Sequence, residues 1–572
     1  MSLNAISYAL PAHIQDAVRS ELADSNPQNL INRIWSKDAS VWTGDDEGKW
    51  LGWLKVVDEQ IGELPKYRAF SNDIETAGFT NILLMGMGGS SLCPEVLAMT
   101  FGKTNFHILD STVPAQVKAV EDKLDLTKTL FIVASKSGST LEPNCLKQYF
   151  FDRISQISDT PGKQFVAITD PGSKMEQIAK DDKFRHIFYG DPEIGGRFSA
   201  LSAFGLTAGA AMGIDPETLL KRAGEMVEAC RSNAASENPG AMLGILLGIC
   251  HRAGRDKLTI FTSPEIHDLG AWLEQLIAES TGKNGVAIIP VDREPILDAD
   301  GYYDDRVFVH LSVKGGRTDE KAYNALEQIE RAGHPIVRIE LESLYHISQE
   351  FFRWEFATAV AGSIMGINPF NQPDVESAKI EARKITDEYE LTGKLPDEKP
   401  FFEADGISLF SNEEYANKLQ AKVAEKSLSA FLRAHLDNIE SRDYFALLAY
   451  LHMNAENGEL LQQIRVRILE SKNVATCLGF GPRFLHSTGQ AYKGGGNNGV
   501  FLQVTSDDEF DLPVPGQKYT FGVVKAAQAR GDFQVLLDRQ RRALRVHISP
   551  SVPMSEGLKL LLKAAAGSSK EL

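Results

Sequence analysis

Short apolar runs alternate with helical patterns along much of the chain. Between residues 80 and 170 these runs predict strands at Asn81–Met85, Phe106–Leu109, Thr129–Ala134 and Phe165–Thr169. Continuous apolar runs of this length are typical of strands buried on both faces of a parallel sheet. The alternation therefore predicts a doubly wound α/β domain, whose ligands bind at the carboxyl ends of the strands.

The same alternation continues through two further regions. From about residue 215, strands are expected at Leu258–Phe261, Val286–Ile289, Val307–Leu311 and Ile336–Ile339. Near the C-terminus, strands are expected at 443–451, 474–480, 500–504 and 543–548. The fold class predicted is therefore α/β, with two tandem parallel-sheet domains and a third C-terminal α/β domain. A site between the first two domains is expected.

Domain boundaries follow from these patterns and from the length of 572 residues, because single hydrophobic cores stop growing near about 250–300 residues. We expect a helical segment at 1–75, a first domain at 76–214, a second at 215–390, a charged linker at 391–403 and a C-terminal domain at 404–572.

The charge balance excludes some partners. A formal net charge of −17 argues against a nucleic acid or an anionic membrane surface, since no basic stripe interrupts it. No apolar run approaches the roughly 20 residues that span a bilayer, and no signal peptide pattern opens the chain. The five scattered cysteines favour a reduced, cytoplasmic location.

The stretch from Ser135 to Thr140, Ser-Lys-Ser-Gly-Ser-Thr, lies between a predicted strand and a predicted helix. Small hydroxyls, backbone N–H groups and the positive end of a helix dipole converge at such a junction, which suits a phosphate group. The spacing is not that of a Walker loop, so a nucleotide is not implied. A polar turn with a hydroxyl N-cap is the alternative.

Two glycine-containing turns add to this. Gly86-Met87-Gly88-Gly89-Ser90 follows another predicted strand, and its glycines let the backbone approach a ligand closely. It resembles a weakened dinucleotide fingerprint, and an ordinary turn is the alternative. Gly195-Gly196-Arg197 presents a guanidinium suited to an oxyanion that develops during a reaction. A structural ion pair is the alternative for Arg197.

Two helical stretches carry further polar groups. Gln275 and Glu279 are four residues apart and share one face of a predicted helix whose neighbours are apolar, an environment that suits a general base. A solvated glutamate is the alternative. Gln372 stands just before the next predicted helix and Lys379 stands inside it, where an ordinary surface lysine is the alternative.

Together and in this order, these five stretches resemble phosphoglucose isomerase. The resemblance covers about residues 80–390, which the family builds as two sugar-isomerase domains of flavodoxin-like topology. Glu350–Glu355 and Gly481–Gln490 are similar to one branch, the isomerase half of bifunctional transaldolase/phosphoglucose isomerase chains. No transaldolase barrel precedes residue 1, so we expect a free-standing relative or an excised portion.

The resemblance implies reversible interconversion of glucose 6-phosphate and fructose 6-phosphate. Glu279 would move a proton between C2 and C1, Arg197 would stabilise the enediolate, and Lys379 would also be catalytic. The substrate and its phosphate would be bound by Gly89, Ser90, Ser135, Lys136, Ser137, Thr140, Gln275 and Gln372. No metal or redox cofactor is implied, which agrees with the scattered His and Cys residues.

One feature of the family pattern is missing. The family opens the sugar ring with a histidine in a Gly-Gln-His-Ala stretch, and no such stretch lies between Lys283 and Tyr345. His310, His334 and His346 lie there, but His310 is within an apolar strand pattern and His334 precedes Pro335 in a predicted turn. Our hypothesis is that His486, with Lys493 adding charge nearby, supplies the missing group. A structural role is the alternative for His486.

Two other functions share the same residues. A dual phosphoglucose/phosphomannose isomerase would differ only in its stereochemical tolerance at C2. A non-catalytic sugar-phosphate-sensing module would keep the phosphate site but would not need Glu279 and Arg197 together. Relatives are commonly dimers that share site residues, and a monomer becomes plausible if the third domain takes the partner's place. The sequence leaves a monomer and a homodimer open.

Overall fold

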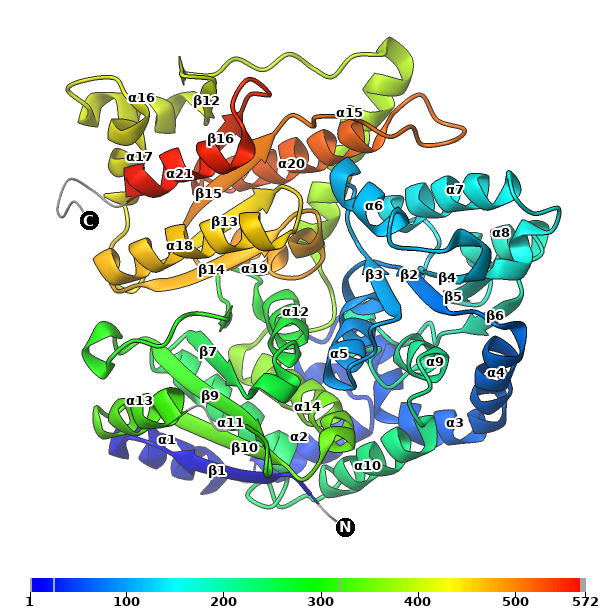
Figure 1. The fold of residues 1–572 in the computed structure, drawn as a ribbon. Helices are drawn as coiled ribbons and strands as arrows, with labels where there is room; N and C mark the ends of the chain where they lie inside the picture. Colours follow the sequence, from blue (N-terminus) through cyan, green and yellow to red (C-terminus); the bar gives the residue numbers. More distant parts are fainter. Residues whose placement is uncertain (1–2, 24–25, 318–319, 566–572) are drawn as a thin grey trace. The chain divides into compact units, whose positions relative to one another are not determined.

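The structure, a computed structural model, describes residues 3–23, 26–317 and 320–565 (Figure 1). Contacts divide the chain into two units, and each is described by itself. Unit 1 comprises Met1–Asp110, Lys123–Arg293 and Asp304–Gln372. Unit 2 comprises Ser111–Asp122, Glu294–Tyr303 and Pro373–Leu572.

The first sheet of unit 1 is entirely parallel, with strand order β3-β2-β4-β5-β6. Its strands are β2 (Asn81–Met85), β3 (Phe106–Leu109), β4 (Thr129–Ala134), β5 (Phe165–Thr169) and β6 (His186–Tyr189). The first four confirm the predicted strands. β6 was not predicted, because as an edge strand it is only partly buried and lacks a continuous apolar run.

The second sheet of unit 1 has the order β1-β10-β9-β7-β8, parallel except for β1. Its strands are β1 (Ala5–Ala9), β7 (Lys257–Thr262), β8 (Ile289–Asp292), β9 (Arg306–Val313) and β10 (Ile336–Leu341). Two predictions were wrong here. The first 75 residues are not all helical, because β1 pairs with the edge of the sheet. β8 begins where the predicted strand ended, because Val286 pairs back on Lys283 in a tight turn.

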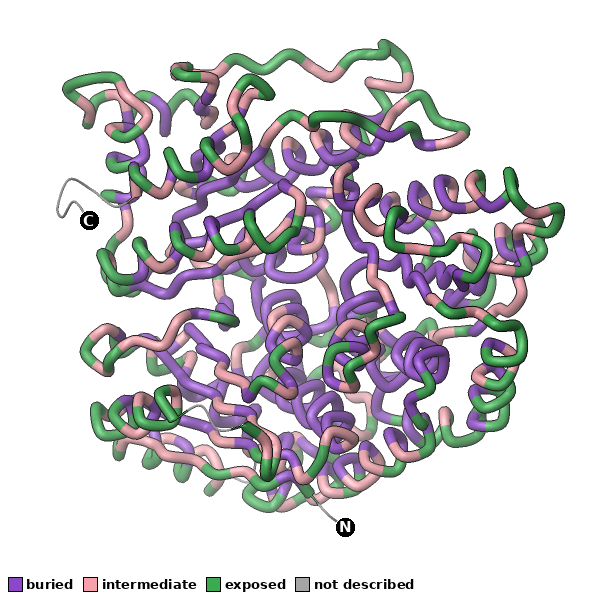
Figure 2. The backbone as a smooth tube through the Cα atoms, in the orientation of Figure 1, coloured by how far each residue is buried: buried purple, intermediate pink, exposed green. Residues whose placement is uncertain are grey.

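Helices cover both sheets of unit 1, and Figure 2 shows buried strands beside helices with exposed outer faces. The principal helices are α4 (Leu64–Ala77), α5 (Leu92–Thr100), α7 (Leu141–Ser155), α8 (Lys174–Asp181), α9 (Ala203–Ala211), α10 (Pro216–Ala229), α11 (Pro239–Arg252), α12 (Leu269–Thr281), α13 (Glu320–Arg331) and α14 (Ile347–Met365). α11 and α14 pack closely, since a Cβ on Gly244 would lie 2.4 Å from the Ala357 carbonyl oxygen. α14 is therefore buried along almost its whole length.

The sheet of unit 2 has the order β11-β12-β16-β15-β13-β14. Its strands are β11 (Phe402–Ala404), β12 (Ile407–Phe410), β13 (Tyr444–Tyr450), β14 (Ala475–Phe480), β15 (Gly499–Ser506) and β16 (Arg542–Ile548). The last four are parallel and confirm the predicted strands, whereas the antiparallel β11 and β12 were not predicted. Both are short, so neither produces a long apolar run.

Unit 2 also gathers helices from distant parts of the sequence. Its helices are α6 (Pro114–Glu121), α15 (Pro373–Thr392), α16 (Glu413–Lys422), α17 (Leu428–Leu436), α18 (Ala455–Lys472), α19 (Gly489–Gly494), α20 (Phe521–Asp538) and α21 (Met554–Ala565). The Thr112 hydroxyl donates to Gln528 Oε1 at 2.7 Å just before α6. α15 begins within the sequence assigned above to the second domain, yet its contacts group it with the C-terminal residues.

Candidate active site

The two predicted ligand turns leave neighbouring strands at the same edge of the first sheet. β2 and β4 are adjacent and parallel, with Met85 opposite Val133. The glycine turn begins directly after Met85, and the Ser135 loop begins directly after Ala134, the last residue of β4. This is the edge at which doubly wound sheets bind ligands. The register therefore brings Gly89 and Ser90 to the same edge as the Ser135 loop.

Gly89 packs directly against the arginine turn. A Cβ at Gly89 would lie 1.9 Å from the Gly196 carbonyl oxygen and 3.0 Å from the Arg197 backbone nitrogen, so any side chain there would collide with backbone. Ser90 is buried within the same turn. A close backbone approach is present here, to the loop that carries Arg197.

Arg197 is almost completely buried and is held by segments far away in the sequence. Its Nε donates to Ser280 Oγ at 2.7 Å, and its Nη1 donates to Gln372 Oε1 at 3.0 Å. Its Nη2 donates to the carbonyl oxygens of Pro369 at 2.7 Å and Asn371 at 3.0 Å. These partners fix the plane of the guanidinium, and all four are uncharged oxygens.

Glu279 faces this guanidinium from α12. Its Oε1 lies 3.4 Å from Arg197 Nη1, and its Oε2 accepts a hydrogen bond of 3.2 Å from Gln275 Nε2. Both Glu279 and Gln275 are buried, so the predicted shared helix face turns inward. A solvated glutamate, the alternative considered above, is wrong for Glu279.

Burial lowers the pKa of Arg197, and the neighbouring Glu279 carboxylate opposes that effect. The guanidinium is desolvated, and its contact with Glu279 at 3.4 Å is not a bidentate pair, so its attraction for a further anion is not cancelled. A buried carboxylate beside such a cation can exchange a proton with a carbon atom while the cation stabilises the resulting anion.

The Ser135 loop contains hydroxyl groups in two different states. Ser135 is buried, and its Oγ has no hydrogen-bond partner among the described residues. Ser137 and Ser139 are hydrogen-bonded to each other at 2.7 Å and are exposed. Thr140 occupies the N-cap position of α7, but its side chain makes no capping hydrogen bond. The hydroxyls of Ser135 and Thr140 can therefore donate to a phosphate oxygen without first breaking a helix cap.

Gly138 makes the turn of this loop possible. Its φ of 68° is left-handed, and a Cβ there would lie 2.2 Å from the Met175 backbone nitrogen at the start of α8. Only glycine combines that backbone conformation with so close a contact.

Lys136 is not a spare cation. Its Nζ forms an ion pair with Asp170, and it also donates to the Pro192 carbonyl oxygen at 3.2 Å. Burial raises the pKa of the Asp170 carboxyl, and the Lys136 ammonium opposes that increase. Sequence reasoning missed Asp170, although its position directly after β5, the neighbour of β4, could have indicated it.

Other functional partners were also missed. Ser280 and the carbonyl groups of Pro369 and Asn371 hold Arg197, as described above. Lys283 is buried, and its Nζ donates to the Ser280 carbonyl at 2.9 Å and to the Asn368 carbonyl at 2.6 Å. Lys283 thus ties the end of α12 to the segment that binds Arg197. Backbone acceptors leave no side-chain pattern in the sequence.

Lys379 and His486 belong to unit 2. Lys379 lies on α15, is 38% exposed in its side chain and forms an ion pair of 2.8 Å with Glu376. His486 ends a short 3-10 helix and is 8% exposed. Lys493, expected to add charge near His486, forms a buried ion pair with Asp532. His310 lies on β9, and burial lowers its pKa, as expected for a packed strand residue.

Among residues 3–23, 26–317 and 320–565, no group of three or more His, Cys, Asp or Glu side chains has the arrangement of a metal site. None of the helices described in the structure has the length and apolar character needed to cross a membrane.

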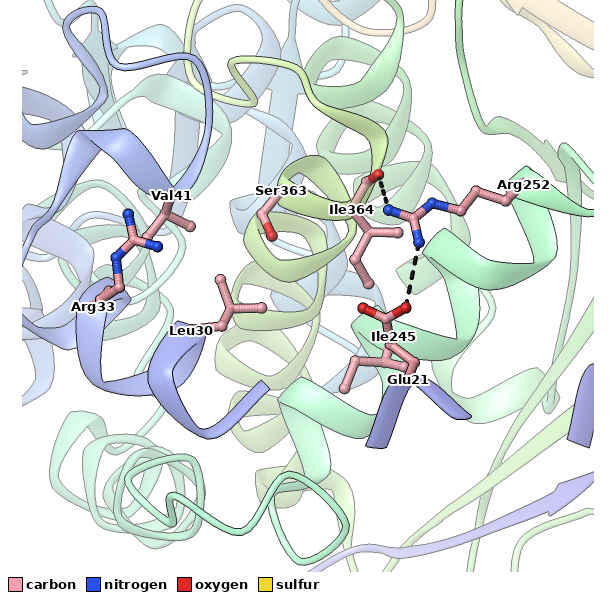
Figure 3. Close-up of a pocket in the computed structure, with 8 residues that line it drawn as sticks. All are labelled: Glu21, Leu30, Arg33, Val41, Ile245, Arg252, Ser363 and Ile364. Carbon is pink, nitrogen blue, oxygen red and sulfur yellow. Dashed lines mark hydrogen bonds and ion pairs between the residues drawn. The ribbon is translucent and has the colours of Figure 1, made fainter. Parts of the chain in front are cut away.

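A small hollow in unit 1 lies apart from these residues (Figure 3). Leu30 and Ile364 contribute apolar lining, and Arg33 and Arg252 lie at its sides. Arg252 is paired with Glu21 at 3.3 Å and donates to the Ile364 carbonyl at 2.9 Å. None of the predicted site residues lines this hollow.

The sequence match to a known family covers the residues around Arg197 and Glu279. The family described as Phosphoglucose isomerase matches residues 59–290. This region contains the glycine turn, the Ser135 loop, Arg197 and Glu279. Gln372, Lys379 and all of the C-terminal sheet lie outside it.

Individual relatives agree with this match. The chain is 28% identical over 367 residues to a glucose-6-phosphate isomerase of Methanocaldococcus jannaschii, covering 58% of this chain and 88% of that protein. It is 31% identical to a glucose-6-phosphate isomerase of Gloeothece citriformis, over 54% of this chain and 57% of that protein. The crystal structure of a glucose-6-phosphate isomerase from Chlamydia trachomatis shares the fold, with a TM-score of 0.57, 19% identity and coverage of 68% and 89%.

Proposed function

We propose that this chain interconverts glucose 6-phosphate and fructose 6-phosphate. The observation that carries the proposal is the buried contact between Arg197 and Glu279, 3.4 Å apart, within the region that matches phosphoglucose isomerase. The relatives named glucose-6-phosphate isomerase support the same activity. The overall reaction moves hydrogen between two adjacent carbons, so no electron acceptor is consumed.

In this proposal Glu279 removes the proton from C2 and returns it to C1, and Arg197 stabilises the negative charge of the enediolate between the two steps. Gln275 keeps the Glu279 carboxylate in place through its hydrogen bond. Gln372 binds the substrate in this proposal, and its Oε1 also accepts a hydrogen bond from Arg197. A sensing module would need no such acceptor of a carbon-bound proton.

The phosphate is held by the loop after β4. Ser135, Ser137 and Thr140 donate from their hydroxyl groups, and Lys136 contributes its ammonium. Because Lys136 already pairs with Asp170, phosphate binding competes with that ion pair. Gly89 and Ser90 form the neighbouring wall, in which Gly89 owes its identity to the contact with Gly196.

The roles of Lys379 and His486 rest on the sequence resemblance and not on contacts in the structure. The resemblance gives Lys379 a catalytic role in the helix after Gln372. His486 is our hypothesis for the group that transfers a proton at the ring oxygen, because the usual histidine stretch is missing. The His486 hypothesis no longer includes Lys493, since that ammonium is neutralised by Asp532.

The finer classification is also a proposal. The Glu350–Glu355 and Gly481–Gln490 stretches favour the branch that occurs fused to transaldolase. Cysteines 93, 145, 230, 250 and 477 are free and buried, which suits a reduced cytoplasm. The substrate is a small sugar phosphate, and the acidic net charge argues against nucleic acid or membrane partners. A monomer and a homodimer both remain compatible with the function.

A coupled assay tests the function. Purified protein is given fructose 6-phosphate, and glucose 6-phosphate is detected with a dehydrogenase while a metal chelator is present. We expect turnover that the chelator leaves unchanged. Binding of the sugar phosphate without turnover would contradict the proposal and favour the sensing module. Replacing the substrate with mannose 6-phosphate, with a matched detection enzyme, distinguishes the dual-specificity alternative.

A further inference from the structure

The start of α15, the helix that carries Lys379, is held by one buried glutamine. Gln490 Oε1 accepts hydrogen bonds from the backbone nitrogens of Asp374 at 2.9 Å and Val375 at 3.2 Å. Gln490 Nε2 donates to Asp374 Oδ2 at 2.8 Å. The first N–H groups of a helix have no partner within the helix, so one side chain from α19 satisfies two of them. Gln490 is 0% exposed and Asp374 is 4% exposed.

A second contact fixes the same turn. The other oxygen of the Asp374 carboxylate, Oδ1, lies 2.7 Å from Arg539 Nη2 at the end of α20. Asp374 therefore connects the start of α15 with two different helices. Because one carboxylate serves both contacts, a shift of the first turn would break the hydrogen bond and the ion pair together.

Close backbone packing restrains the middle of α15. A Cβ at Gly531 of α20 would lie 2.7 Å from the Ala382 nitrogen and 3.1 Å from the Ala382 Cα. The two helices therefore touch through backbone at this point. Lys379 lies between the two restraints, the capped first turn and the Ala382 contact.

We propose that Gln490 is a positioning residue for Lys379, acting through the first turn of α15. The inference rests on the proposed function, in which Lys379 is a catalytic group. Val375 and Lys379 are four residues apart, so Gln490 binds the helical turn directly before the lysine. Within unit 2, Gln490 thus holds the helix that carries Lys379 in register.

The test is a double-mutant cycle with Gln490→Leu and Lys379→Ala. Leucine keeps the approximate volume of Gln490 and removes its hydrogen bonds to Asp374 and Val375. We expect kcat to fall about tenfold to 100-fold with KM within about twofold, because small displacements of a catalytic group are costly. In the Lys379→Ala background the same change should alter kcat by less than about twofold. Gln534→Leu, at an exposed glutamine on α20, is the matched control and should leave kcat unchanged.

The other outcomes overturn the inference. An unchanged kcat in Gln490→Leu, or losses that multiply in the double variant, would show that Gln490 does not act through Lys379. Full activity of Lys379→Ala would also overturn it, while the role of Glu279 is measured separately by Glu279→Gln. If Gln490→Leu does not fold, Gly531→Ala displaces α15 by another route. Gly531→Ala should lower kcat in the otherwise unaltered protein and should leave it unchanged in the Lys379→Ala background.

Discussion

Both units bury several cations, and two of these, Arg197 and Lys493, have different kinds of partner. In unit 1, Arg197 is bound by uncharged oxygens, with the Glu279 carboxylate at 3.4 Å. In unit 2, Lys493 forms an ion pair with Asp532, and both side chains are 1% exposed. A buried cation without a tight partner still attracts an anion, whereas a paired one is neutralised. The contrast agrees with the role proposed for Arg197 and suggests a structural role for Lys493, which the following experiments test.

The largest expected effect tests the carboxylate beside Arg197. Glu279→Gln should fold normally and lose turnover by roughly 10²- to 10⁴-fold, because it removes a positioned base. The coupled assay measures turnover, and circular dichroism checks the fold. Glu327→Gln, at a half-exposed position on α13, is the control. Retained turnover in Glu279→Gln would remove this residue from the role of base.

The next effect concerns the paired cation of unit 2. Lys493→Met should destabilise the protein by about 3–5 kcal/mol, because it leaves the Asp532 carboxylate buried without its partner. Denaturant unfolding measures the change. The double variant Lys493→Met/Asp532→Leu should recover much of that loss, since it removes both charges. A neutral effect of the single variant would mean that this ion pair is not a structural support.

Arg197→Lys sharpens the comparison by keeping the charge and changing its geometry. A lysine cannot donate in the directions of Ser280, Gln372 and the two carbonyl groups at once. We expect kcat/KM to fall about 100-fold, as when one preorganised donor to a developing anion is lost. Arg331→Lys, at an exposed arginine, serves as control. Near-normal activity would show that charge alone suffices.

His486→Ala tests whether unit 2 also supplies chemistry. If His486 moves a proton at the ring oxygen, turnover of cyclic substrate should fall at least about tenfold. Loss of a general acid or base typically lowers the rate by roughly 10²- to 10⁴-fold. Turnover of the open-chain form should be unaffected. Stopped-flow assays started from each form separate the two rates. Equal rates to the unaltered protein with both forms would refute the hypothesis.

The smallest effect concerns Lys136 and Asp170. Since the pKa of Asp170 is raised in the folded protein, its contribution to stability is fully present below the unfolded carboxyl pKa and is lost as pH rises through the folded value. Asp170→Asn should remove this loss, which melting temperatures across that pH range would show. It should also lower KM a fewfold, because Lys136 becomes available to phosphate. A raised KM would indicate that Asp170 positions Lys136.

Much of the fold could be predicted from the chain alone. Buried parallel strands such as β2 and β4 have continuous apolar sequences. Because such strands run parallel, the turns that follow them lie at the same edge of the sheet. Short or exposed edge strands such as β6 and β11 escaped prediction, because little of their surface is buried. Val286 was misassigned because an apolar residue in a tight turn has the same local pattern as one in a strand.

The sequence by itself determined which residue types follow the strands, including the Ser135 loop and Gly195-Gly196-Arg197, because spacing and residue chemistry are local properties. Only the tertiary structure decided their partners. Arg197 meets Ser280 across 83 positions and Gln372 across 175, and Lys136 is paired by an aspartate on another strand end. Such contacts depend on how sheets and helices pack, and the pairing of two residues so far apart has no local signal in the sequence.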